Sequence, residues 1–126
     1  MQLNQVTVPA LDVARAAAFY QQLGLRLIVK ALPHYVRLEC PGGGSTFSVH
    51  QVEELPHGEG ISVYFECADL DERYERLHNQ GVDFEQPPTD QSWMWREARL
   101  RDPAGNRIIL YWAGEHRRYP PWRVGE

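Results

Sequence analysis

The sequence predicts an α+β domain made of two tandem βαβββ units. Three pairs of matching positions support this prediction, and the members of each pair are 57 residues apart, as in 69 minus 12. The pairs are Val6 and Val63, Asp12 and Asp69, and Gly24 and Gly81. Equal offsets for a strand, a helix start and a helix end indicate a duplicated unit.

The whole chain of 126 residues fits a single domain, 1–126, with enough sequence to bury a core. We expect the first repeat at residues 1–52 and the second at residues 61–113. Residues 53–60 are polar with Pro56 and two glycines, which predicts a linker. Residues 114–126 contain Pro120 and Pro121, which a strand does not tolerate, so we expect an irregular tail docked by its aromatic residues.

The first repeat begins with an alternating strand at Val6–Val8, followed by Asp12 as a helix N-cap. Apolar residues from Val13 to Tyr20 fall on one helical face, and Gly24 ends the helix. Three strands are then expected, at residues 25–29, 35–40 and 46–52, with the Pro-Gly-Gly-Gly turn at 41–44 between the last two.

The second repeat follows the same plan, with a strand at Val63–Phe65 and a helix capped by Asp69, with Glu72 three residues on. Gly81 ends this helix. The strands expected after it are residues 82–85, 94–101 and 107–112, with a turn at 102–106.

Composition limits the kinds of partner that we expect for this protein. A formal charge of −4 and a pI near 5.7 provide no broad basic face, so we expect no nucleic-acid partner. No stretch approaches the ~20 apolar residues of a membrane span, and no export signal precedes the domain, so we expect a cytoplasmic protein and no membrane partner. Cys40 and Cys67 are expected to be reduced.

Three motifs together resemble the glyoxalase, bleomycin-resistance and extradiol-dioxygenase superfamily, also called vicinal oxygen chelate proteins. They are Val6-x-Val8 followed by Asp12-x-x-x-Ala16-x-x-Phe19-Tyr20-x-x-Leu23-Gly24, then Phe65-x-x-x-Asp69-Leu70-Asp71, and Asp102-Pro103-Ala104-Gly105-Asn106-Arg107-Ile108. The resemblance covers nearly everything except the tail. It implies a half-open barrel with its helices outside, a concave inner face that holds the site, and frequent homodimers.

The resemblance also implies a metal site with a ligand on the first and last strand of each repeat, normally His or Glu. The matching positions here are Gln5, Ser48, Ser62 and Ile109. Divalent ions need imidazole, carboxylate or thiolate ligands, and none of these four residues supplies one. We therefore expect no cofactor and identify the chain as a member without the usual ligands, which disfavours a divalent metal without excluding it.

Strand alternation predicts which residues face the pocket, because Val63, Phe47 and Ile108 should pack beneath the helices. The predicted ligand-binding residues are Gln5, Thr7, Tyr35, Arg37, Ser48, His50, Ser62, Tyr64, Trp93, Trp95, Arg99 and Tyr111. Aromatic faces with a few polar groups are typical of a small-ligand pocket.

Three residues are candidates for catalysis, His50, Tyr64 and Glu97, although no nucleophile is tied to them by sequence. For each a simpler role stands beside the chemical one. Binding or packing is the favoured role for His50. Alternating charges such as Glu97 and Arg99 more often form a solvated charge ladder, and tryptophans also bury themselves at dimer interfaces.

Two functional classes follow. The first is a metal-free small-molecule binding protein of the bleomycin-resistance kind with an aromatic-lined pocket. The second is an enzyme of the same superfamily, a lyase, isomerase or dioxygenase acting on a small oxygenated metabolite. The missing metal ligands favour the first class and count against the second without excluding it. A third reading is an interaction module whose tail and tryptophans serve assembly.

Overall fold

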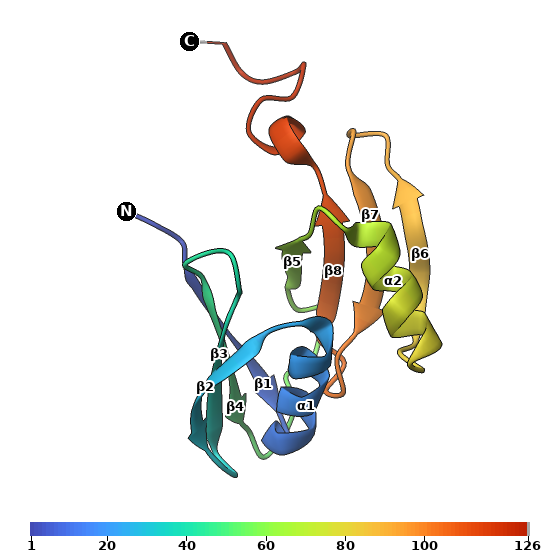
Figure 1. The fold of residues 1–126 in the computed structure, drawn as a ribbon. Coiled ribbons are helices and arrows are strands. Elements are labelled where there is room, and N and C mark those ends of the chain that lie inside the picture. Colours follow the sequence, from blue (N-terminus) through green and yellow to red (C-terminus); the bar gives the residue numbers. More distant parts are fainter. Residues whose placement is uncertain (126) are drawn as a thin grey trace. The chain divides into compact units, whose positions relative to one another are not determined.

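The computed structural model describes residues 1–125 and divides into two compact units, both drawn in Figure 1. The first unit contains residues 1–60 together with the turn 102–106, and the second contains residues 61–101 and the chain from Arg107 onward. Each unit has one helix and its own open four-stranded sheet. The α+β class and the repeated βαβββ unit predicted from the sequence are confirmed.

The first unit has the strand order β1–β4–β3–β2, with β1 parallel to β4 and the other neighbours antiparallel. Its elements are β1 (Gln5–Ala10), α1 (Val13–Leu23), β2 (Arg26–Ala31), β3 (Tyr35–Glu39) and β4 (Thr46–Gln51). Helix α1 packs on this sheet (Figure 1).

Helix α1 begins and ends where the sequence predicts. The Asp12 side chain accepts a hydrogen bond from the backbone N–H of Arg15 at 3.0 Å, which satisfies one free donor of the first turn. Gly24 ends the helix with φ at 119°, in the left-handed region that glycine adopts without a Cβ clash.

The turn at residues 102–106 is organised by Asp102, whose side chain is buried. Its carboxylate accepts hydrogen bonds from the backbone N–H groups of Ala104 and Asn106, both at 2.9 Å, and from the Tyr20 hydroxyl at 2.5 Å. The Asn106 side chain donates to the Pro9 carbonyl at 3.0 Å. Burial and the nearby carboxylate raise the pKa of Tyr20 far above its usual range. The Asp-Pro-x-Gly-Asn motif thus ties this turn to α1 and β1.

The second unit has the strand order β5–β8–β7–β6, again with one parallel pair, β5 and β8. Its elements are β5 (Ser62–Glu66), α2 (Leu70–Asn79), β6 (Phe84–Asp90), β7 (Arg96–Arg101), β8 (Arg107–Trp112) and the short 3₁₀-helix η1 (Gly114–Arg117). No helix formed by residues 1–125 is both long enough and apolar enough to cross a membrane.

Helix α2 starts where expected but without the expected cap. Asp69 stands at the N-cap position, yet its side chain makes no capping hydrogen bond. Its carboxylate instead pairs with the Arg73 guanidinium at 3.2 Å, one turn into the helix. Asp71 and Glu72 still place negative charge in the first turn, where the helix dipole favours it.

Two predicted strand starts in the second unit are wrong. Strand β6 starts two residues later than predicted and runs through Pro87 and Pro88, because an edge strand tolerates a missing N–H donor. Strand β7 starts at Arg96 rather than at Met94, since Met94 has φ at 68° and ends an irregular loop. The tail, expected to be irregular, opens with η1.

Apolar residues at alternate positions of β4 and β8 are buried, and the residues between them are buried as well. Phe47 and Val49 of β4 and Ile108 and Leu110 of β8 are buried on the helix side of their sheets. In α1 the apolar face contributes Tyr20, which contacts Phe47 with ring centroids 4.5 Å apart. The face of each sheet opposite its helix is therefore left for polar and aromatic side chains.

Candidate functional site

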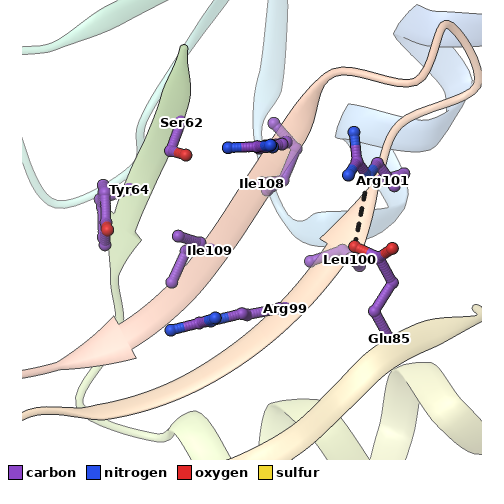
Figure 2. A pocket seen from close by; sticks show the side chains of 9 residues that line it. Ser62, Tyr64, Glu85, Arg99, Leu100, Arg101, Ile108 and Ile109 are labelled. Atoms are coloured by element: carbon purple, nitrogen blue, oxygen red, sulfur yellow. Dashed lines mark hydrogen bonds and ion pairs between the residues drawn. The ribbon is translucent and has the colours of Figure 1, made fainter. Parts of the chain in front are cut away.

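The face of the second sheet opposite α2 carries a hollow of about 380 Å³, shown in Figure 2. It is lined by Ser62, Tyr64, Glu85, Arg99, Leu100, Arg101, Arg107, Ile108 and Ile109. This volume lies at the lower end of the range of small-ligand pockets, which starts at about 300 Å³. The hollow therefore has room for a small organic molecule.

The lining is arranged in rows, because β5, β8 and β7 are neighbours and their residues pair in register. One row contains Ser62, Arg107 and Arg101, and the next contains Tyr64, Ile109 and Arg99. Figure 2 shows Tyr64, Ile109 and Arg99 following one another across the three strands. Arg101 is paired with Glu85 of the neighbouring strand β6, with 3.2 Å between Nε and Oε1.

Arg99 is held in place by a fully buried carboxylate. Glu97 is 0% exposed, and its Oε1 accepts hydrogen bonds from Arg99 Nε at 3.3 Å and from Nη2 at 3.0 Å. Its second oxygen, Oε2, accepts a hydrogen bond from the Trp93 indole N–H at 3.0 Å. A buried carboxylate costs free energy unless both of its oxygens are satisfied, and here they are.

Three aromatic rings pack together on the same face. Trp95 stacks on Tyr111 with centroids 4.7 Å apart, and Tyr64 meets both rings edge-on at 5.8 and 5.5 Å. Tyr111 was predicted to face the pocket, but this packing buries it to 6% exposure, and burial followed by the charge of Glu66 raises its pKa. Of these three rings, only Tyr64 lines the hollow.

The equivalent face of the first unit carries a hydrogen-bonded network. Gln5 donates through Nε2 to Ser48 Oγ at 2.8 Å and to Thr7 Oγ1 at 3.2 Å. Ser48 Oγ lies 2.6 Å from the Tyr35 hydroxyl, which accepts a hydrogen bond from Arg37 Nε at 2.9 Å. The bond to Ser48, with Arg37 as a second cause, lowers the pKa of Tyr35. Ser48 itself is fully buried rather than facing open solvent.

The catalytic candidates are not brought together. His50 is exposed beside Tyr35 in strand register, and no carboxylate of residues 1–125 is hydrogen-bonded to it. Glu97 is buried against Arg99, so it is neither exposed nor free to accept a proton from a ligand. Tyr64 lines the hollow without a neighbouring base in its row. The geometry supports contact with a ligand better than acid–base chemistry.

The residues at the family's metal-ligand positions do not fit a divalent ion. In the first unit the Gln5 amide oxygen accepts a hydrogen bond from the Thr46 hydroxyl, and Ser48 Oγ is bonded to Gln5 Nε2 and to the Tyr35 hydroxyl, so both neutral groups are engaged within the protein. In the second unit Ser62 is a neutral hydroxyl and Ile109 has no donor atom. Among residues 1–125, no group of three or more His, Cys, Asp or Glu side chains could hold a metal ion.

The hollow is more charged than the sequence suggests. Of the residues that the sequence assigns to the pocket, Ser62, Tyr64 and Arg99 line the hollow. An aromatic lining was expected, but Trp93 and Trp95 lie in the loop before β7 rather than on a strand. Reasoning from the sequence missed Glu85, Arg101 and Arg107. The two arginines flank the turn 102–106 at positions that a hairpin makes direct neighbours, and this signal could have identified them.

The duplicated unit and the Asp102 turn are also found by comparison with a known protein family. The sequence model of the Glyoxalase/Bleomycin resistance protein/Dioxygenase superfamily matches residues 2–110. The chain belongs to this superfamily.

Individual relatives agree with that placement. The chain is 42% identical over 58 residues to the uncharacterized protein YraH of Bacillus subtilis (strain 168), and the aligned region covers 43% of this chain but only 45% of YraH. A glyoxalase/bleomycin resistance protein/dioxygenase from Nocardioides has a TM-score of 0.77 at 22% identity, covering 99% of this chain and 90% of that one. The bleomycin resistance determinant encoded on the transposon Tn5 has a TM-score of 0.75 at 20% identity, covering 90% of this chain and 99% of that one. At these identities the two structures show the fold alone.

Proposed function

We propose that this chain is a small-molecule binding protein of the glyoxalase/bleomycin-resistance type that holds its ligand, without a metal, in the hollow of the second unit. The observation that carries the proposal is the hollow itself, which combines Tyr64 as a contact surface with the polar groups of Ser62 and Arg99. Sparse polar groups beside an apolar wall fix the orientation of a bound molecule. The Tn5 determinant named as a bleomycin resistance protein shares this fold.

Three features give an enzyme less support. The residues at the family's metal positions lack suitable ligand atoms, His50 has no acidic partner among residues 1–125, and Glu97 is enclosed by its ion pair. A lyase, isomerase or dioxygenase would need a proton acceptor or a metal within reach of the ligand. Binding alone needs neither.

The proposal includes a homodimer in the cytoplasm. Trp112, Tyr119 and Trp122 expose large aromatic surfaces, which are common at the centre of subunit interfaces. Both cysteines, Cys40 and Cys67, are unpaired, as in proteins from reducing compartments. A native mass spectrum that shows only monomer at micromolar concentration would contradict the dimer.

A thermal-shift screen tests the binding proposal. A ligand at about a hundred times its Kd stabilises the native state by roughly 3 kcal/mol. For a domain of this size we expect Tm to rise by roughly 5 °C or more. Elemental analysis of protein purified without chelator should show no stoichiometric metal. A tightly bound metal in every chain would overturn the metal-free proposal.

A pair of tryptophan variants locates the binding. Ser62→Trp should fill the hollow and abolish the shift in Tm, whereas Ser92→Trp, in the exposed loop before β7, should leave it unchanged. Equal shifts in the two variants would place the ligand elsewhere. A screen in which no small molecule raises Tm would contradict the proposed function as a whole.

A further inference from the structure

We infer that the hollow of the second unit selects small organic oxyanions, carboxylates or phosphates, and that Arg99 is the residue that grips the anionic group. The inference rests on the proposed function, because it names the class of ligand for the same hollow. Arg101 and Arg107 supply the surrounding positive potential, and Glu97 and Trp93 act as positioning residues.

The residues that line the hollow carry a net positive formal charge, whereas the chain as a whole is negative. The whole protein has a formal charge of −4, yet the nine lining residues include three arginines and one glutamate. Cations gathered in a concave wall raise the local concentration of anions even when the molecule as a whole repels them. A neutral or cationic ligand would gain nothing from this arrangement.

Strand register places the three arginines on one face. Arg101 lies directly opposite Arg107 on the neighbouring strand, and Arg99 is two residues before Arg101, so it points to the same side. Like charges directly opposite each other destabilise a sheet. Glu85 offsets part of this repulsion through its ion pair with Arg101. An oxyanion bound in this row would offset it further, which couples ligand binding to the stability of the hairpin.

Arg99 is held ready for such a ligand. Glu97 binds the guanidinium through Nε and one N–H of Nη2, which uses only part of the donors of the group. The buried carboxylate is itself fixed by the Trp93 indole at 3.0 Å. The Arg99 side chain remains 43% exposed, so its other donors are open to the hollow. A guanidinium fixed before binding loses little side-chain entropy when it binds, and its planar fork matches carboxylate and phosphate oxygens.

The neighbouring residues define the other half of the ligand. Tyr64 is 45% exposed and lies in the same row as Arg99, with Ile109 between them (Figure 2). An aromatic ring placed on Tyr64 and Ile109 would set an attached carboxylate or phosphate beside Arg99. The geometry therefore fits an aromatic oxyanion better than a bare inorganic ion.

A titration followed by ¹H–¹⁵N NMR distinguishes these chemistries. The probes are benzoate, phenyl phosphate, the neutral benzamide, and inorganic phosphate. We expect benzoate or phenyl phosphate to bind at least about tenfold more tightly than benzamide, because a charge-assisted pair is stronger than a neutral hydrogen bond. The stronger of the two anions assigns the ligand as a carboxylate or a phosphate. The affinity should fall as salt rises, since exposed charges are screened.

Two arginine variants test the role of Arg99. Arg99→Gln should weaken binding of the anionic probe about tenfold and change benzamide affinity by less than about twofold. Arg76→Gln, on the exposed side of α2, removes the same charge away from the hollow and should leave both affinities within about twofold. If Arg99→Gln is poorly folded, as judged by its NMR spectrum, Arg99→Lys keeps the positive charge beside Glu97 but loses the planar fork, and it should weaken binding of the anionic probe more than binding of benzamide.

Each other outcome has a definite meaning. If benzamide binds as tightly as benzoate and shifts the signals of Ser62 and Tyr64, the hollow binds small molecules without selecting anions, so this inference fails and the proposed function stands. If none of the four probes shifts those signals, the selection of oxyanions is refuted, and the wider thermal-shift screen decides the proposed function separately.

Discussion

The inner faces of the two units share a backbone plan but differ in chemistry. Arg37 faces Ser48 across the sheet of the first unit, and Arg99 faces Ile109 at the equivalent place in the second. Each arginine reaches back to the residue two positions before it. That residue is the neutral phenol of Tyr35 in the first unit and a carboxylate, Glu97, in the second.

This difference explains why only the second of the two repeated units carries the candidate binding site. In the first unit Ser48 accepts from Gln5 and bonds to Tyr35, so the polar groups at the centre of the face satisfy one another. In the second unit Ile109 occupies the central position and cannot take part in such a network. The charged side chains around it are left to face the hollow. Two differences, Ile109 in place of Ser48 and Glu97 in place of Tyr35, thus separate a candidate binding site from a closed polar network.

The largest change in stability is expected from a substitution in the turn that joins the last two strands of the second repeat. Asp102→Ala removes a carboxylate that accepts from Tyr20 and from backbone donors of its own turn. Leaving those buried donors unpaired should lower the free energy of unfolding by about 3 kcal/mol or more. Chemical denaturation measures the change.

The equivalent turn of the first unit provides the control. Gly43→Ala adds a Cβ that meets nothing within 4 Å, so we expect a change smaller than about 0.5 kcal/mol. Similar losses in Asp102→Ala and Gly43→Ala would mean that the buried aspartate is not what distinguishes the two turns.

A smaller loss of stability is expected when the residues that contact Arg99 and Arg37 are substituted. Glu97→Gln replaces a fully buried carboxylate and leaves Arg99 with a weaker partner, so stability should fall by about 2 kcal/mol. Tyr35→Phe removes the bond to Ser48 and the bond accepted from the Arg37 guanidinium, but at a partly exposed site where water can replace them, so it should cost only about 1 kcal/mol. If the two variants lose equal stability in urea, burial of the charged pair does not set the second unit apart.

The smallest effect is a pH dependence of opposite sign at two tyrosines. The pKa of Tyr20 is raised by burial and by Asp102, so its contribution to stability is complete below the usual tyrosine pKa of 10.0 and is lost as the pH rises above it. The pKa of Tyr35 is lowered by Ser48 and Arg37, so its contribution is present above 10.0 and is lost as the pH falls through the lowered value.

Unfolding of Tyr20→Phe and Tyr35→Phe between about pH 8 and pH 11 measures this difference. The stability gap between wild type and Tyr20→Phe should narrow with rising pH, and the gap for Tyr35→Phe should widen. Gaps that move in the same direction would show that the two phenols have similar environments.

Much of the fold could be predicted because its signals are local. The Asp12 cap, the Gly24 stop and the strand Arg107–Trp112 are found where the sequence predicts them. The start of β7 was misjudged because apolar Met94 and Trp95 resemble a strand, whereas the positive φ of Met94 shows that the chain turns there.

The site was only partly predictable. Ser62, Tyr64 and Arg99, which alternation assigns to the pocket, line one hollow, but alternation could not show that Tyr111 and Ser48 are buried. Burial of Tyr111 depends on how its ring stacks on Trp95 of the loop before β7, and burial of Ser48 on contacts with Gln5 and Tyr35 from other strands. The identity of neighbouring residues along the chain does not encode such contacts.

The sequence by itself determined the duplication, the superfamily and the unsuitability of Gln5, Ser48, Ser62 and Ile109 as metal ligands, because these depend on residue identity and spacing alone. Only the tertiary structure decided that Arg99 is clamped by a buried glutamate and that Arg101 and Arg107 lie opposite each other beside it. The physical reason is that charge and burial act through space. Residues on different strands combine into one electrostatic surface only when strand pairing sets their register.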